Sequence, residues 1–76
     1  MNYAECKEIA ENKVKTFNAT IGKAYKLGDD YVFDSSEEYI GIFPVVVGSK
    51  DGKCTGLWQY LNENDMTMDD MQEVEL

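Results

Sequence analysis

The longest apolar run in the 76-residue chain extends from Tyr39 to Val47 and is broken by Pro44. The three consecutive valines at 45–47 show no polar alternation, which predicts a strand covered on both faces. Pro44 has no N–H to donate to a sheet ladder, so we expect a bulge there. We predict that Tyr39–Phe43 pairs with the preceding strand and Val45–Gly48 with the following one. The run would then be the centre of a small sheet.

The N-terminal segment from Asn2 to Asn18 has the pattern of one amphipathic helix. Asn2 followed by Glu5 three residues later is typical of a capping box at a helix start. Apolar residues recur at three- and four-residue spacing and would form one stripe that faces the sheet: Cys6, Ile9, Ala10, Val14 and Phe17.

Shorter apolar segments separated by turn residues predict the other strands. They cover residues 23–27, 31–34 and 54–60, with turns at 28–30 and 49–53 and a loop at 35–38. We expect a loop at 61–65, a short helix capped by Thr67 and ending at Asp70, and an edge strand marked by Val74 and Leu76. The predicted fold class is α+β, a single domain over residues 1–76. Its N-terminal helix would pack on a four- or five-stranded antiparallel sheet.

The net charge of −8 is carried entirely by the second part of the chain. Residues 1–30 hold five lysines and five acids, whereas residues 31–76 hold two lysines and ten acids, and 2 − 10 gives −8. Such a surface repels phosphates and anionic lipids, so we expect neither direct nucleic-acid binding nor membrane binding. A basic protein partner is compatible with this charge, and an acidic surface that serves only solubility is the alternative.

The composition lacks the residues of several common catalytic chemistries. The chain has no His and no Arg, so Ser–His and Cys–His pairs and bidentate anion clamps are missing. Its carboxylates do not follow the spacing of a calcium loop. We therefore expect no enzyme activity, no metal and no cofactor.

The N-terminus has a polar helical pattern rather than the basic and apolar regions of a signal peptide. No apolar run reaches the ~20 residues that a transmembrane helix needs. We therefore expect a cytoplasmic protein in which Cys6 and Cys54 are free thiols. A disulfide between the two cysteines is the alternative.

The aromatic residues indicate a binding surface. In each predicted strand the aromatic residues lie an even number of positions apart and so share one face, while aliphatic residues lie on the other face. One helix covers only one face of a sheet, so the aromatic face would be exposed to a protein partner. The alternatives are that these residues pack in the core or that residues 66–76 cover the second face. The candidate partner-binding residues are the aromatics Tyr39, Phe43, Trp58 and Tyr60 and the acidic residues Glu63, Asp65, Asp69 and Asp70.

The segment Phe43-Pro44-Val45-Val46-Val47-Gly48-Ser49-Lys50-Asp51-Gly52-Lys53 resembles the proline-led hairpin of small bacterial toxin-immunity domains. Peptidase-propeptide (PepSY) domains share a similar helix-then-hairpin pattern and are a second resemblance. The chain departs from both at Gly48-Ser49, where an acidic residue is usual, and in its acidic C-terminal tail. The resemblance implies a domain that neutralises a toxin, and it carries no functional residue over to this chain.

The resulting hypothesis is a non-catalytic protein-binding domain that neutralises a toxin or effector. A phage-type inhibitor that mimics the charge of nucleic acid is one alternative. A self-associating structural module without a toxin partner is another. The sequence leaves open whether the chain is a monomer or a homodimer.

Overall fold

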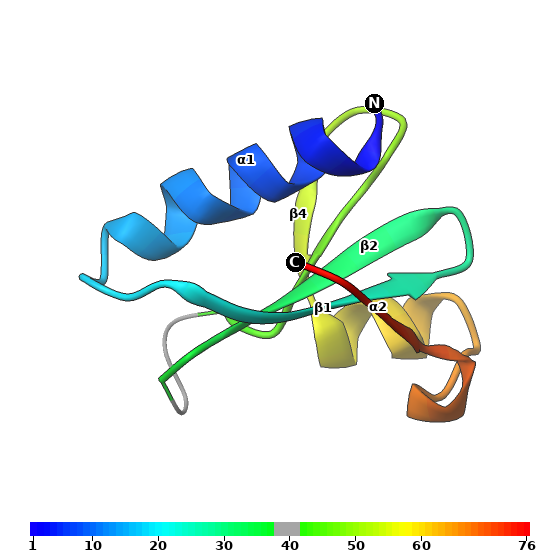
Figure 1. The fold of residues 1–76 in the computed structure, drawn as a ribbon. Helices are drawn as coiled ribbons and strands as arrows, with labels where there is room; N and C mark the ends of the chain where they lie inside the picture. Colours follow the sequence, from blue (N-terminus) through cyan, green and yellow to red (C-terminus); the bar gives the residue numbers. More distant parts are fainter. Residues whose placement is uncertain (38–41) are drawn as a thin grey trace.

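The computed structural model describes residues 1–37 and 42–76, and within them it has the predicted α+β arrangement. An N-terminal helix is followed by a five-stranded antiparallel sheet, with a short second helix after the fourth strand (Figure 1). The order across the sheet is β4-β3-β2-β1-β5, so β4 and β5 are its edges. The strands are β1 (Ile21–Leu27), β2 (Asp30–Ser35), β3 (Val45–Val47), β4 (Cys54–Gly56) and β5 (Gln72–Val74).

The N-terminal helix α1 (Tyr3–Lys15) begins at the predicted capping box. Asn2 Oδ1 accepts a hydrogen bond from the Glu5 N–H at 2.8 Å, and Glu5 Oε1 accepts one from the Asn2 N–H at 3.0 Å. These bonds satisfy N–H groups that a helix start otherwise leaves without a partner. The helix ends at Lys15, three residues before the predicted end. Phe17 therefore lies outside the helix and is 46% exposed instead of joining its apolar stripe.

The sheet has a hydrophobic core on each of its two faces, under α1 on one side and α2 (Leu57–Glu63) on the other (Figure 1). The cluster under α1 contains Cys6, Ala10, Val14, Ala24, Phe33, Phe43, Val45 and Val47. The cluster under α2 contains Leu27, Val32, Val46, Leu57 and Leu61. All three valines of β3 are fully buried, which confirms the prediction that this strand is covered on both faces.

Of the two interpretations of the aromatic strand residues, packing in the core is correct for Phe33 and Phe43, and an exposed aromatic face is wrong. Phe33 and Val32 do lie on opposite faces of β2, but the aromatic face is the one that α1 covers. Phe33 is fully buried, and its ring stacks on that of Tyr3 with 5.9 Å between ring centroids. Tyr31 meets the same Tyr3 ring edge-on at 5.2 Å. These aromatics pack α1 on the sheet, while the aliphatic face is covered by a helix that the sequence pattern did not predict.

The predicted strand at 54–60 is wrong beyond Gly56, and the predicted loop at 61–65 is wrong as far as Glu63. Residues 57–63 form α2 instead. Leu57 and Leu61 are four residues apart and lie on one side of that helix, where they are 1% and 7% exposed. The physical reason is coverage, because a longer β4 would leave the apolar face around Val46 exposed to water.

The predicted pairing of the central run is wrong in part. β3 pairs with both neighbours, and Val46 lies opposite Val32 on one side and Thr55 on the other. Residues 45–47 therefore make the described pairing with β2. Ile42 and Phe43 are not in a strand, and the rest of that prediction, residues 39–41, lies outside the described residues.

The C-terminal segment completes the sheet as predicted. Thr67 caps a short 3-10 helix, η1 (Met68–Asp70), and β5 then pairs antiparallel with β1. The Tyr3 hydroxyl donates a hydrogen bond to the Glu75 carbonyl at 2.9 Å. This bond joins the start of α1 to the residue that follows β5. Leu76, which was expected to mark the strand, lies beyond it and is 52% exposed.

Both cysteines are free thiols, as predicted, with Cys6 buried under α1 and Cys54 half-buried in β4. Burial raises the pKa of the Cys6 thiol, so it stays protonated and packs as a small apolar side chain. In the part of the chain that the structure describes, no helix is both long and apolar enough to cross a membrane.

Candidate functional site

Among the residues that the structure describes, Trp58 is the most exposed large apolar side chain, at 64%. Its exposure follows from which side of α2 packs on the sheet. Leu57 and Leu61 fix the buried side of the helix, and Trp58 follows Leu57 by one position, which is a rotation of about 100°. Trp58 therefore lies on a flank of the helix, where it is exposed, and Gln59, Asn62 and Glu63 are exposed as well. An exposed Trp is unusual, because indole rings bury a large area and dominate the energetics of cores and interfaces.

An apolar notch lies beside the Trp58 ring. It has a volume of about 420 Å³ and is lined by Ile42, Phe43, Pro44, Gly56, Leu57, Trp58 and Gln59. The Leu57 N–H donates to the Pro44 carbonyl at 3.0 Å, which holds the start of α2 against the segment before β3. Ile42 is 42% exposed, so two large apolar side chains lie at the surface around this notch. We refer to these seven residues as the Trp58 notch.

The acidic candidates are distributed along and beyond α2. Glu63 is exposed on the same side of the helix as Gln59, and its carboxylate accepts a hydrogen bond from Gln59 Nε2 at 3.4 Å. Asp65, with φ of 53°, follows the helix and is exposed. Asp69 and Asp70 are exposed in η1, beyond the C-terminal end of α2 (Figure 1). Asp70 also takes part in the helix cap, because its Oδ2 accepts a hydrogen bond from the Thr67 N–H at 2.9 Å.

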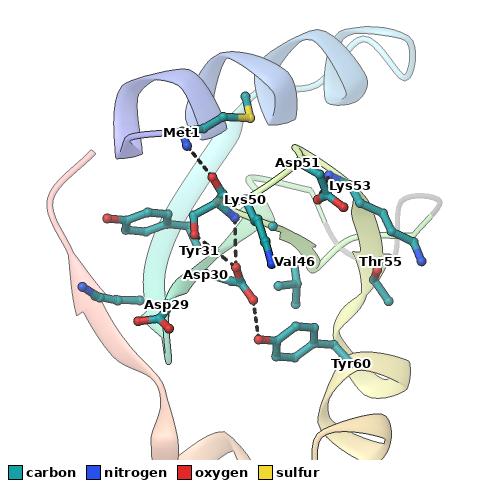
Figure 2. A pocket seen from close by; sticks show the side chains of 13 residues that line it. Met1, Asp29, Asp30, Tyr31, Val46, Lys50, Asp51, Lys53, Thr55 and Tyr60 are labelled. Carbon is teal, nitrogen blue, oxygen red and sulfur yellow. Dashed lines mark hydrogen bonds between the residues drawn. The ribbon is translucent and has the colours of Figure 1, made fainter.

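Tyr60 is half-buried and points in a different direction, into a second pocket at the end of the sheet (Figure 2). Its hydroxyl donates to Asp30 Oδ2 at 2.5 Å. Asp30 Oδ1 accepts from the Ser49 N–H at 2.9 Å and from the Ser49 hydroxyl at 3.4 Å. One carboxylate thus joins α2, the start of β2 and the loop after β3.

Burial, the hydrogen bond to Asp30 and the negative charges of Asp30 and Asp29 together raise the pKa of Tyr60 to about 12. The phenol is therefore neutral at physiological pH, and its hydroxyl proton forms the hydrogen bond to Asp30. This arrangement suits a structural tie between elements. It does not suit a base or a nucleophile. Such a group needs a lowered pKa, or an adjacent base that takes its proton during the reaction.

The pocket around this tie has a volume of about 750 Å³ and is lined by both signs of charge. Lys50 extends across the view in front of Val46, while Lys53 points away on the β4 side (Figure 2). Three lysines (Lys26, Lys50 and Lys53) and three aspartates (Asp29, Asp30 and Asp51) line it, so its side-chain charges cancel. Among the described residues, no group of three or more His, Cys, Asp or Glu side chains could hold a metal ion.

The predicted aromatic group is therefore not one surface. Phe43 is 6% exposed and belongs to the core under α1, Tyr60 is engaged with Asp30, and Tyr39 lies outside the described residues. Of the four aromatics, Trp58 is the one that the structure places at the surface of the described chain. The sequence reasoning missed Ile42 and Pro44 as its neighbours. The spacing of Leu57 and Leu61 was the signal that could have indicated a helix and hence an outward Trp58.

Neither a known family model, a curated protein nor a solved structure matches this chain.

Proposed function

We propose that this chain is a non-catalytic protein-binding domain that holds a basic partner protein at the Trp58 notch. The observation that carries the proposal is the 64% exposure of Trp58 beside an apolar notch. The core of the domain does not use this ring, since Leu57 and Leu61 already anchor α2. Removing the exposed part of a Trp ring from water stabilises a complex by about 2 to 3 kcal/mol, on the scale of an interface hot spot.

The charge of the chain supports a basic partner. The net charge is −8, and Glu63 is exposed on α2, the helix that carries Trp58. Opposite charges speed the encounter of two proteins and disfavour acidic competitors, while buried apolar contacts supply most of the affinity. The Trp58 notch and the acidic surface thus account for affinity and selectivity respectively.

Within this function, we propose neutralisation of a toxin or effector as the biological role. The support for that role is the resemblance of residues 43–53 to the hairpin of immunity domains. A cationic target, such as an enzyme that acts on nucleic acid, has the charge that this surface would attract. Occupying the target would suffice, because blocking a site requires no catalysis by the inhibitor.

Affinity capture from the cell that makes the protein, at low and at high salt, identifies a partner for measurement with purified components. The proposal predicts a partner that is basic and whose association rate falls steeply as salt rises, since the Debye length falls from about 10 Å at 0.1 M to about 3 Å at 1 M. An acidic partner, or an association rate that salt leaves unchanged, would contradict the proposal that charge attracts the partner. Binding by the Trp58→Ala variant tests the apolar contact, and the proposal predicts that this variant loses binding.

A further inference from the structure

Among the residues that the structure describes, no strand pairs with the outer side of β4, which is an edge of the sheet. Its outward peptide groups can be identified from the ladder. The Gly48 N–H donates to the Lys53 carbonyl at 2.9 Å, and the Leu57 N–H donates to the Pro44 carbonyl at 3.0 Å. Hydrogen bonds toward one neighbour alternate along an antiparallel strand, so residues 53, 55 and 57 face β3. The N–H and C=O of Cys54 and the N–H of Gly56 then point away from β3. The Gly56 carbonyl is different, because an N-cap carbonyl accepts the first bond of its helix.

The two edges of the sheet are protected to different degrees. β5 carries Glu73 and is followed by Glu75, and charged residues at an edge discourage pairing with another chain. β4 is Cys54-Thr55-Gly56 and carries no charge itself, although the exposed Lys53 directly precedes it. In the ranges 1–37 and 42–76, no hydrogen bond engages its three outward groups. Gly56 has no side chain, and an added Cβ would have the Ile42 carbonyl oxygen as its nearest neighbour, at 3.9 Å.

This edge is continuous with the Trp58 notch. Gly56 is at once the last residue of β4, the N-cap of α2 and part of the notch lining. A strand laid beside β4 alternates its side chains between the two faces of the sheet. Backbone groups of the added strand would meet Cys54 and Gly56, while one apolar side chain would enter the notch against Trp58.

We propose that the partner contributes an extended segment that pairs with β4 as an added strand, with an apolar side chain in the Trp58 notch and basic residues beside it. This inference rests on the proposed function and specifies how the partner is recognised. Main-chain hydrogen bonds provide affinity and the pocket for one side chain provides specificity, as in other cases of strand addition. The basic residues follow from the net charge of −8 and from Glu63, which is exposed on α2.

The test uses a synthetic peptide, acetyl-Lys-Val-Lys-Leu-Lys-Val-Lys-amide, and two N-methylated versions of it. One version is methylated at the peptide nitrogens of the odd-numbered residues and the other at those of the even-numbered residues. In a paired strand, only one of these sets of N–H groups faces β4. We expect the unmodified peptide to slow hydrogen exchange at the Cys54 and Gly56 amides. One methylated version should bind at least about tenfold more weakly, and the other should bind within about threefold of the unmodified peptide.

A protein variant supplies the reciprocal test. Gly56 has φ of −59°, which proline adopts, so Gly56→Pro removes the outward N–H and is compatible with the backbone. We expect Gly56→Pro to weaken peptide binding by about tenfold or more. If the variant fails to fold, the methylated peptides with the unmodified protein decide the question.

The outcomes separate this inference from the proposed function. If Trp58→Ala abolishes peptide binding while Gly56→Pro and both methylated peptides bind fully, the notch binds protein and strand addition is wrong. If the peptide does not bind the unmodified protein, or binds without slowing exchange at Cys54 and Gly56, the inference is also overturned. The proposed function is then judged by the natural partner alone.

Discussion

The Tyr60 hydroxyl donates a hydrogen bond of 2.5 Å to Asp30 Oδ2, which ties α2 to the start of β2 across 30 positions of sequence. The other oxygen of Asp30 accepts from both the N–H and the hydroxyl of Ser49. Three separate elements are therefore held by one carboxylate (Figure 2). α2 has no side-chain cap at its N-terminus. Its position, and with it the direction of Trp58, is fixed by this bond, by its two buried leucines and by the hydrogen bond from the Leu57 N–H to the Pro44 carbonyl.

Removing this hydrogen bond should destabilise the fold, at a residue that does not line the Trp58 notch. We expect Tyr60→Phe to lower the free energy of unfolding by about 1 to 2 kcal/mol, because the half-buried carboxylate of Asp30 loses one donor. Urea unfolding measures the change. A value near zero would mean that water replaces the hydroxyl without cost, and the tie would then be unimportant for stability.

The raised pKa of Tyr60 predicts a loss of stability at high pH. Its pKa is about 12 in the folded state and 10.0 for an unperturbed tyrosine. A group whose pKa is raised on folding contributes stability that is complete below the unfolded pKa and is lost as pH rises through the folded pKa. The loss should therefore begin near pH 10 and be complete near pH 12. Unfolding at a series of pH values checks this, and the same series on Tyr60→Phe should show a smaller decline across that interval.

The two sides of α2 should respond differently to truncation. We expect Leu61→Ala to cost about 2 to 4 kcal/mol, because Leu61 is 7% exposed and packs against the sheet. Trp58→Ala should cost less than about 1 kcal/mol, because its ring is 64% exposed. Equilibrium unfolding of both variants compares them directly. The opposite order would mean that Trp58 is a core residue and would remove the basis of the proposed surface.

Two glycines of the hairpin region provide a matched pair for backbone effects. Gly52 has φ of +73°, and a Cβ there would come within 2.9 Å of Ile9 Cδ1. Gly56 has φ of −59°, with its nearest neighbour to a Cβ at 3.9 Å. We expect Gly52→Ala to lower the free energy of unfolding by about 1 to 3 kcal/mol and Gly56→Ala to change it by about 0.5 kcal/mol or less. Equal effects would contradict the described turn.

Much of the fold could be predicted from local patterns. The Asn2–Glu5 capping box, the β1–β2 hairpin and the Thr67 cap each depend on residues within a few positions of one another. The three consecutive valines of β3 were enough to predict that this strand is covered on both faces. The fold class needed only the order of these elements, which is why α+β with an antiparallel sheet was predicted correctly.

The second helix could not be separated from a strand by periodicity. In residues 57–61, the alternation of Leu57 and Leu61 with Trp58 and Tyr60 fits a strand, and the four-residue leucine spacing fits a helix. Which one forms is decided by the far face of the sheet, where Val46 and its neighbours need a cover. The Tyr60–Asp30 bond was likewise unpredictable, because it exists only once α2 lies across the sheet.

The central claim is that Trp58 binds a partner, and the dissociation constant of the identified, purified partner tests it directly. Phe17→Ala is the matched control, since Phe17 is also an exposed aromatic, at 46%, but is not part of the Trp58 notch. We predict that Trp58→Ala raises the dissociation constant about 30-fold or more, which corresponds to about 2 kcal/mol, while Phe17→Ala changes it less than about threefold. Equal affinity for the unmodified protein and Trp58→Ala would contradict the claim.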